Sequence, residues 1–255
     1  MNYSFSSLNL FLQCERRWFY ERVQKRPVPS NVFFPLGTLY HACIAAELGN
    51  GASADVASIA AVHSKRADWR AASPLHVLVK EIEQNLMRLR RDVFLNIKVI
   101  PPLELRIKHD GVTVVLDCVS EWTPTTDAAG YVTGHVDQPC VVDWKVKFST
   151  RERRTQDSVE ESAQLALYCL ESGYQNAAFV EIPRDVRAPI QTFVSRFPPD
   201  DLVRWRRWHD NQRAAMGTRG PDEAAYRLAE PGHKLCSATY CPFFSTCPGG
   251  RCDGV

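Results

Sequence analysis

Val141-Val-Asp-Trp-Lys-Val-Lys147 is the stretch of this 255-residue chain that decides its fold. The run is rich in β-branched residues and predicts a central strand. From Val141 to Val146 it is apolar apart from Asp143 and Lys145. Successive side chains point to opposite faces of a strand, so Asp143 and Lys145 share one face. An Asp/Lys pair on a solvated strand face is common, but a pair emerging from so apolar a run favours a chemical role.

A second carboxylate lies upstream of this strand. The stretch 103–108 alternates in polarity, His109-Asp-Gly111 is typical of a turn, and 112–119 is rich in β-branched residues, which together predict a hairpin. Asp117 lies near the end of its second strand. If that strand neighbours 141–147, Asp117 faces Asp143, and two close carboxylates are tolerated when a hard divalent cation lies between them. Mg²⁺ would leave room there for a phosphate oxygen and an attacking water, which Lys145 could orient.

The rest of the chain alternates between helical and extended patterns. Helices are expected over 4–23 (capped by Ser4, Ser6 or Ser7), 36–48, most of 52–95, 158–173 (with a Ser158/Glu161 capping box and Gly173 at its end) and 200–216. Further strands are expected over 179–182 and 190–197, and 123–130 is a polar stretch. This order predicts one α/β domain over 1–255, with a mainly helical part (1–100), a catalytic sheet core (101–200) and a helix with a cysteine tail (201–255).

Composition narrows the class of protein. Hydrophobic residues make up 45% of the chain and charged residues 24%, which suits a globular core. Lys+Arg 31 against Asp+Glu 29 leaves a net charge of +2, so any nucleic-acid role has to rest on local basic clusters. No apolar run approaches a membrane span, and the N-terminal residues do not resemble a secretory signal. We therefore expect a cytoplasmic protein.

Cysteines gather near the C-terminus. Four of the nine are Cys236, Cys241, Cys247 and Cys252, and the other five are scattered singly. In a cytoplasmic protein such clustering favours metal binding over disulfides. Four thiolates suit a soft site, which means an iron–sulfur cluster or zinc.

Several short motifs occur along the chain in an order that resembles a known protein family. The set is Gly37-x-x-x-His41, Glu104, Asp117, Asp143-x-Lys145 and Gln164-x-x-x-Tyr168, with cysteines on both sides. From Ser6 to Cys247 the chain resembles the RecB-like branch of the PD-(D/E)XK nuclease superfamily, which includes helicase-associated nucleases, CRISPR adaptation exonucleases and phage recombination exonucleases. The resemblance implies a restriction-endonuclease-like core, in which helices flank a mixed central sheet.

The resemblance also implies roles for the site residues. His41, Asp117, Asp143 and the backbone carbonyl of Trp144 are the implied metal ligands, and Lys145 is the implied catalytic lysine. Gln164 and Tyr168 match a helix that lies by the active site and the DNA strand, and Glu104 matches an accessory acidic position. Val115-Leu116 stands before Asp117 where the family usually has a small residue, often glycine, which is a mild departure.

The cysteines of the tail resemble those that bind a [4Fe–4S] cluster in the same branch, where the ligands come from both ends of the chain. The implied ligands are Cys14, Cys236, Cys241 and Cys247. Four residues separate Cys236 from Cys241 where the family usually has two, which puts Cys236 in question. The alternative is a local zinc site that uses Cys252 instead of Cys14.

Basic residues follow the central strand and recur elsewhere. Lys147, Arg151, Arg153 and Arg154 are candidates to grip DNA phosphates. Other basic clusters comprise Arg16, Arg17 and Arg22, and Arg204, Arg206 and Arg207 interleaved with Trp205 and Trp208. Each of these basic clusters is typical of a solvated protein surface as well as of a DNA-binding site.

The sequence therefore predicts a Mg²⁺- or Mn²⁺-dependent DNA exonuclease. Its substrate would be single-stranded DNA or a duplex end, in recombination, repair or CRISPR adaptation, with no membrane role. At this length the chain has no room for a helicase motor, so unwinding would come from a partner. The alternatives are a catalytically silent DNA-binding adaptor on the same fold, and an RNA or nucleotide hydrolase.

Overall fold

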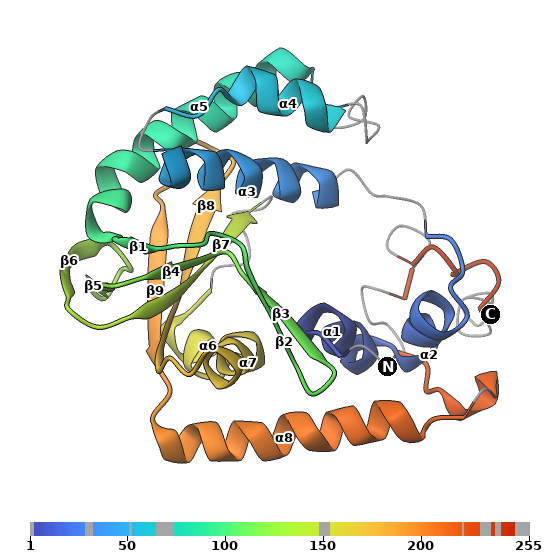
Figure 1. Ribbon diagram of the computed structural model, residues 1–255. Coiled ribbons are helices and arrows are strands. Elements are labelled where there is room, and N and C mark those ends of the chain that lie inside the picture. Colours follow the sequence, from blue (N-terminus) through green and yellow to red (C-terminus); the bar gives the residue numbers. More distant parts are fainter. Residues whose placement is uncertain are drawn as a thin grey trace. The chain divides into compact units, whose positions relative to one another are not determined.

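The computed structural model describes residues 3–28, 33–50, 53–64, 74–147, 154–220, 222–229, 236–237 and 241–247. Contacts divide the chain, drawn in Figure 1, into two compact units. The smaller unit combines Met1–Pro29, Lys108–Thr113 and Arg206–Val255, and the larger unit combines Ser30–Ile107 and Val114–Trp205. The single domain over 1–255 stays a prediction.

A five-stranded mixed sheet forms the centre of the larger unit, in the order β1-β4-β7-β8-β9. The strands are β1 (Val99–Ile100), β4 (Cys118–Ser120), β7 (Cys140–Lys147), β8 (Asn176–Pro183) and β9 (Gln191–Arg196). β7 and β8 are parallel, and the other neighbours are antiparallel. The expected central strand is thus β7, in the middle of the sheet, and the prediction of a mixed central sheet flanked by helices is confirmed.

Side chains along β7 alternate between a face that packs in the hydrophobic core and a face that carries the candidate site residues. Val142 and Trp144 belong to a hydrophobic cluster with α3 (Phe33–Asn50) and α5 (Leu75–Asp92). Asp143 and Lys145 therefore point to the opposite face, where α7 (Ala163–Ser172) contacts β7 and β8. Figure 1 shows α3 and α5 on one side of the sheet and α7 on the other.

The helix α5 is amphipathic, and an ion pair joins it to α3. On α5 the buried side chains of Leu78, Ile82, Leu86 and Leu89 recur every three or four residues. Arg90 of α5 forms a two-pronged ion pair with Glu47 of α3, whose Oε2 also accepts from the backbone N–H of Ala54 at 2.8 Å. The expected helix over 36–48 is thus confirmed in the longer α3, and the helical stretch 52–95 contains α4 (Val56–Ser64) and α5.

The helix expected over 158–173 is two helices, so that prediction was wrong in its start and its capping box. α6 (Gln156–Glu160) has a capping box formed by Thr155 and Ser158. α7 then begins after Ser162, whose hydroxyl accepts from the backbone N–H of Leu165. Gly173 ends α7 with φ 79°, as expected, because this left-handed conformation suits glycine.

Two hairpins accompany the sheet. β2 (Leu105–His109) and β3 (Val112–Leu116) form the expected hairpin. Its second strand was predicted too long, because the chain bends at Asp117 and continues as β4 in the central sheet. β5 (Thr123–Thr126) and β6 (Val132–Val136) form a hairpin where only a polar stretch was expected.

The smaller unit joins both ends of the chain. The helix expected over 4–23 is interrupted at Cys14, which is extended and separates α1 (Phe5–Gln13, capped by Ser4) from α2 (Glu15–Trp18), and a π-helical turn (Phe19–Val23) follows. Arg16, expected on a basic face, is instead buried, donating to the Tyr226 carbonyl and pairing with Glu223 at 2.7 Å. The remaining helices are α8 (Pro199–Thr218) and short 3₁₀ turns at Phe94–Asn96 and Glu223–Ala225. Within the described ranges, no helix has the length and apolar character that crossing a membrane requires.

Candidate active site

Asp117 stands at the bend between β3 and β4, beside the middle of β7. The register pairs Cys118 with Val142, which brings the preceding Asp117 level with Asp143. The Trp144 backbone N–H donates to Asp117 Oδ2 over 2.9 Å. This bond fixes the Asp117 carboxylate against β7 and confirms that the two strands are neighbours.

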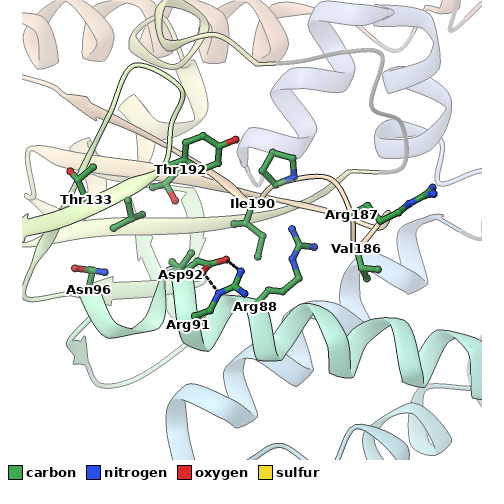
Figure 2. Close-up of a pocket in the computed structure, with 13 residues that line it drawn as sticks. Arg88, Arg91, Asp92, Asn96, Thr133, Val186, Arg187, Ile190 and Thr192 are labelled. Atoms are coloured by element: carbon green, nitrogen blue, oxygen red, sulfur yellow. Dashed lines mark hydrogen bonds and ion pairs between the residues drawn. The ribbon is translucent and has the colours of Figure 1, made fainter.

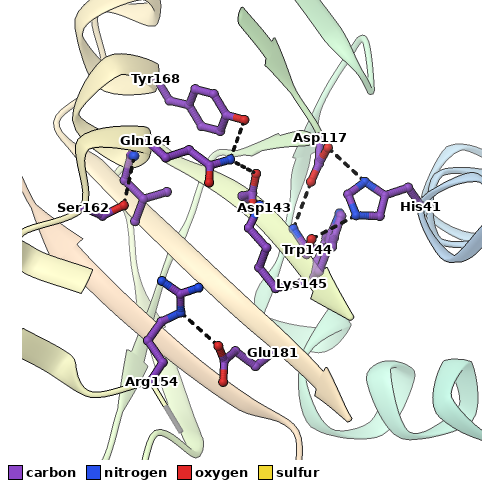
Figure 3. A network of polar contacts seen from close by, with 11 residues as sticks. His41, Asp117, Asp143, Trp144, Lys145, Arg154, Ser162, Gln164, Tyr168 and Glu181 are labelled. Carbon is purple, nitrogen blue, oxygen red and sulfur yellow. Dashed lines mark hydrogen bonds and ion pairs between the residues drawn. The ribbon is translucent and has the colours of Figure 1, made fainter. Parts of the chain in front are cut away.

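His41 reaches the same point from α3 (Figure 3). Its Nε2 lies 2.9 Å from the Trp144 carbonyl oxygen and its Nδ1 lies 3.2 Å from Asp117 Oδ1. A carbonyl oxygen only accepts, so Nε2 carries a proton. Burial lowers the pKa of His41, but the hydrogen bond and charge of Asp117 and the charge of Asp143 outweigh burial and leave that pKa raised. The imidazole is therefore poised to be a cation between two acceptors.

Asp143 is the buried carboxylate of the site, with its residue only 2% exposed. Burial and the nearby charge of Asp117 raise its pKa, against the opposing effect of the Lys145 ammonium. Oδ1 accepts from the Gln164 side-chain amide at 2.9 Å. Oδ2 lies 2.5 Å from the Lys145 Nζ and has no other partner among the described residues. Asp143 therefore has a buried oxygen with spare acceptor capacity.

Lys145 lies beside Asp143 on the same face of β7, as predicted. Its side chain keeps 30% of its exposure, so the ammonium is accessible to a ligand. The Nζ also lies 5.3 Å from the centre of the Phe179 ring on β8. An amine that touches a buried carboxylate and still reaches solvent can meet a phosphate at this site.

Gln164 and Tyr168 share a face of α7, as their spacing predicted. The Gln164 amide donates to Asp143 Oδ1 and, at 2.8 Å, to the Tyr168 hydroxyl. Burial and the Asp143 charge raise the pKa of Tyr168, so its hydroxyl stays neutral. The helix thus orients the carboxylate on β7.

The remaining acidic and basic candidates are placed differently. Glu104 is exposed, with φ 53°, and precedes β2 instead of lying in it; its backbone N–H donates to the Asp117 carbonyl. Lys147 and Arg154 pair with Glu181 at 3.2 and 2.9 Å. Arg151 and Arg153 lie outside the described residues.

Glu181 is a buried carboxylate that the sequence reasoning missed. It lies on β8 directly across from Lys145, and its side chain is 5% exposed. The Arg154 guanidinium also covers the Phe179 ring, 4.1 Å from its centre. A signal was available, because Phe179-Val-Glu181-Ile182 places a carboxylate in an apolar strand just as 141–147 does.

The donor types at this site, though not their present spacing, suit a hard divalent cation. Carboxylate and main-chain carbonyl oxygens are the ligands that Mg²⁺ and Mn²⁺ prefer, and Asp143 offers a buried oxygen that only Lys145 contacts among the described residues. His41 would first have to release the proton that it shares with the Trp144 carbonyl. Among the residues that the structure describes, no three His, Cys, Asp or Glu side chains are grouped closely enough to hold a metal ion.

The cysteines gather within the smaller unit. Cys14, Cys236, Cys241 and Cys247 line one pocket, together with aromatic residues such as Tyr20 and Phe243, and none of the four forms a disulfide with another described residue. Burial raises the pKa of Cys241, and charge on Cys14 and Cys247 adds to that rise. The four predicted ligands thus line the same pocket without being grouped at metal-binding distance, and their role as ligands stays a prediction. Cys252 lies outside the described residues.

The comparisons with known proteins assign the family. The model of the PD-(D/E)XK nuclease superfamily matches residues 2–248. The chain therefore belongs to the PD-(D/E)XK nuclease superfamily, and that prediction is confirmed. The RecB-like branch and the iron–sulfur cluster stay predictions. No curated protein matches the chain.

Solved structures share the fold at low sequence identity. A protein from Eubacterium rectale, provisionally named an exonuclease, is 10% identical, with a TM-score of 0.54 over 100% of this chain and 88% of its own. The structure of SSO0001 is 14% identical, covering 98% of this chain and 87% of its own, but its TM-score of 0.43 is too low to carry an argument. The similarity to the Eubacterium rectale structure supports the restriction-endonuclease-like fold.

Proposed function

We propose that this nuclease is an exonuclease that requires Mg²⁺ or Mn²⁺ and hydrolyses single-stranded DNA or DNA ends. The observation that carries the proposal is the meeting of His41, Asp117, Asp143 and Lys145, which come from three separate segments of the chain. The provisional name of the Eubacterium rectale protein agrees with exonuclease activity.

The residues divide the work by their chemistry. His41, Asp117, Asp143 and the Trp144 carbonyl would hold the divalent cation, which when bound polarises phosphoryl oxygens and eases deprotonation of water. Lys145 offsets negative charge that grows on the phosphate during attack and positions the attacking water. Gln164 holds Asp143 in one orientation, and Tyr168 stays a neutral hydroxyl beside the strand.

Phosphate binding extends along the basic segment after β7. Glu181 pairs with both Lys147 and Arg154, so one carboxylate faces two cations and an excess of positive charge remains for a DNA phosphate. Arg151 and Arg153 belong to the same segment and join this proposal. Glu104 contributes from its place beside Asp117, where an exposed carboxylate can reach a second cation or a water.

Cleavage of end-labelled DNA tests the proposal. Linear single-stranded, linear duplex and circular single-stranded substrates are incubated with Mg²⁺ or Mn²⁺, with a matching RNA alongside. We expect the linear DNA to be shortened from an end and Lys145→Ala to lose that activity. Lys98→Ala, which removes a lysine exposed elsewhere in the larger unit, is the matched control. Cleavage of circles, preference for RNA, or equal activity of wild type and Lys145→Ala would contradict the proposal.

The cysteine pocket would hold a [4Fe–4S] cluster with a structural role. Cys14, Cys236, Cys241 and Cys247 line it, and clustered thiolates are stabilised by a cationic centre. Iron content and visible absorption are measured on the protein as purified, for Cys14→Ala and for Cys252→Ala. We expect colour that depends on Cys14 and not on Cys252. A colourless zinc protein that needs Cys252 would support the alternative zinc site.

The cellular setting follows from the family resemblance alone. Recombination, repair or CRISPR adaptation would supply DNA ends, and a helicase or adaptation partner would supply unwound strands. Co-purification of the tagged, metal-free protein with and without nuclease treatment tests for such a partner. A protein partner that survives removal of DNA supports this setting, and recovery of DNA alone counts against it.

A further inference from the structure

The larger unit has a polar pocket that the residues proposed for catalysis do not line. It has a volume of ≈ 540 Å³ and lies where the end of α5, the loop between β8 and β9 and the start of β6 meet (Figure 2). Its lining includes Arg88, Arg91, Asp92, Tyr131, Arg187 and Thr192. Three guanidinium groups against the carboxylates of Asp92 in the lining and Asp185 beside Arg187 leave this pocket positive.

Arg88 is the most enclosed of the three arginines. It donates to Asn85 Oδ1 at 2.7 Å and to the Ala188 carbonyl, and both acceptors are neutral. Burial lowers the pKa of Arg88, and the Asp92 charge offsets only part of this effect. Asn85 is itself fully buried and donates to the Tyr40 hydroxyl and the Pro183 carbonyl, so Arg88 is held in place. Among the described residues Arg88 has no carboxylate hydrogen-bond partner, so an anion that binds beside this fixed cation stabilises it.

The other two arginines are available to a ligand. The Arg91 side chain is 74% exposed in its pair with Asp92, and the Arg187 side chain is 88% exposed in its pair with Asp185. Exposed ion pairs contribute little free energy, so exchanging them for a ligand costs little. Figure 2 shows Arg91 within the pocket and Arg187 at its rim.

Thr192 supplies an independent observation. The residue is 1% exposed, and its Oγ1 has no hydrogen-bond partner among the described residues. Buried hydroxyls are nearly always partnered, and none of the described residues partners this one, which favours a bound ligand. Arginines and a hydroxyl all donate hydrogen bonds, which suits an anion with several acceptor oxygens.

We infer that this pocket binds a phosphate-bearing ligand, with Arg88, Arg91, Arg187 and the Thr192 hydroxyl as hydrogen-bond donors at different points of its lining. The volume exceeds what a lone phosphate fills, so the ligand carries more than the anion. Tyr131, 44% exposed in the same lining, offers a face on which a base stacks. The phosphate therefore belongs to a nucleic-acid strand or to a free nucleotide. The phosphate assignment rests on these contacts, and the nucleic-acid source rests on the proposed function.

Binding is measured without divalent metal, in EDTA, so that no strand is cut. The probes are a fluorescent single-stranded oligonucleotide, a deoxynucleoside monophosphate and inorganic phosphate. We expect the double variant Arg91→Gln/Arg187→Gln to weaken strand binding about tenfold and to reduce its log–log salt slope by about 0.7. Arg204→Gln removes an equally exposed arginine of the larger unit, paired with Asp201, and serves as the matched control.

Thr192→Val removes the hydroxyl and keeps the shape of the side chain. We expect it to weaken phosphate binding severalfold without lowering the melting temperature, since no protein hydrogen bond is lost. Weakened strand binding identifies a backbone phosphate, and weakened mononucleotide binding alone identifies a free nucleotide. Unchanged affinity for every probe in both variants overturns the inference.

Cleavage assays on the same variants keep this inference separate from the proposed function. Activity that is insensitive to Lys145→Ala would remove the proposed catalytic site and leave the binding result standing. Affinity that is insensitive to the pocket variants, with cleavage lost in Lys145→Ala, would remove the pocket alone.

Discussion

The side-chain amide of Gln164 on α7 donates to Asp143 Oδ1 on β7, at 2.9 Å, while also donating to Tyr168. A helix residue thereby sets the direction in which the buried carboxylate presents its other oxygen. The contact lies within the larger unit and joins two motifs that stand 21 positions apart in the chain.

Replacing this amide tests its orienting role. Gln164→Leu keeps the bulk of the side chain but leaves Asp143 Oδ1 without its donor, so we expect the cleavage rate to fall about 10- to 100-fold, as for other residues that orient metal ligands. Single-turnover rates with Mn²⁺ measure the loss. Gln13→Leu, on the exposed surface of α1, is the control. Equal rates for both variants would show that Asp143 needs no such support.

Neutralising Asp143 should separate stability from activity. Its pKa is raised, which means that the folded protein disfavours the ionised form. We therefore expect Asp143→Asn to raise the melting temperature in EDTA at neutral pH while abolishing cleavage. Thermal unfolding of both proteins measures the shift. A lower melting temperature would mean that the Lys145 contact outweighs the cost of burying the carboxylate.

Removing the Glu181 charge should destabilise the larger unit. Glu181→Gln leaves Lys147 and Arg154 without the carboxylate that both contact. Breaking a buried pair costs about 3–5 kcal/mol, and the partial exposure of both cations reduces the expected loss to about 2 kcal/mol. Urea unfolding measures the free energy. Asp157→Asn, on the exposed start of α6, should stay within about 0.5 kcal/mol of wild type.

Low pH should weaken the ion pair between Glu47 of α3 and Arg90 of α5. The hydrogen bonds of Arg90 lower the pKa of Glu47, against the opposing effect of burial. A lowered folded-state pKa contributes stability that is present above the unfolded-state pKa and is lost as the pH falls through the folded value. We expect the stability difference between wild type and Glu47→Gln to be larger at pH 7 than at pH 3. A constant difference would contradict this account.

Local patterns predicted most helices and the central strands of the larger unit and the residues of each motif that share a face, while His41 was assigned to the site through the family resemblance. The alternation around Asp143 and Lys145, and the helical spacing of Gln164 and Tyr168, depend only on near neighbours in the chain. The bend at Asp117 was not predicted, because it arises where the chain leaves the β2–β3 hairpin to join the central sheet. Glu181 was missed although its apolar surroundings offered the same signal as Asp143.

Long-range partners account for the remaining misses. Arg16 reads as a solvated residue by helical periodicity, yet its partner Glu223 lies 207 positions away. The capping box is formed by Thr155 and Ser158. Glu161 lies at the C-terminal end of α6, where its carboxylate cannot cap the N-terminus of the helix. The arginine pocket combines α5 with the loop between β8 and β9, and no local pattern brings these segments together.

The pairing of Arg16 with Glu223 and the Tyr226 carbonyl has a consequence for biosynthesis. A ribosome makes Arg16 207 positions before its partner Glu223. The larger unit draws its sheet from residues 99–196 and can pack earlier, since domains form as their segments become available. A ribosome that stalls before Glu223 would thus leave Trp18 and Phe19 without the Tyr226 ring that contacts both, and accessible to chaperones.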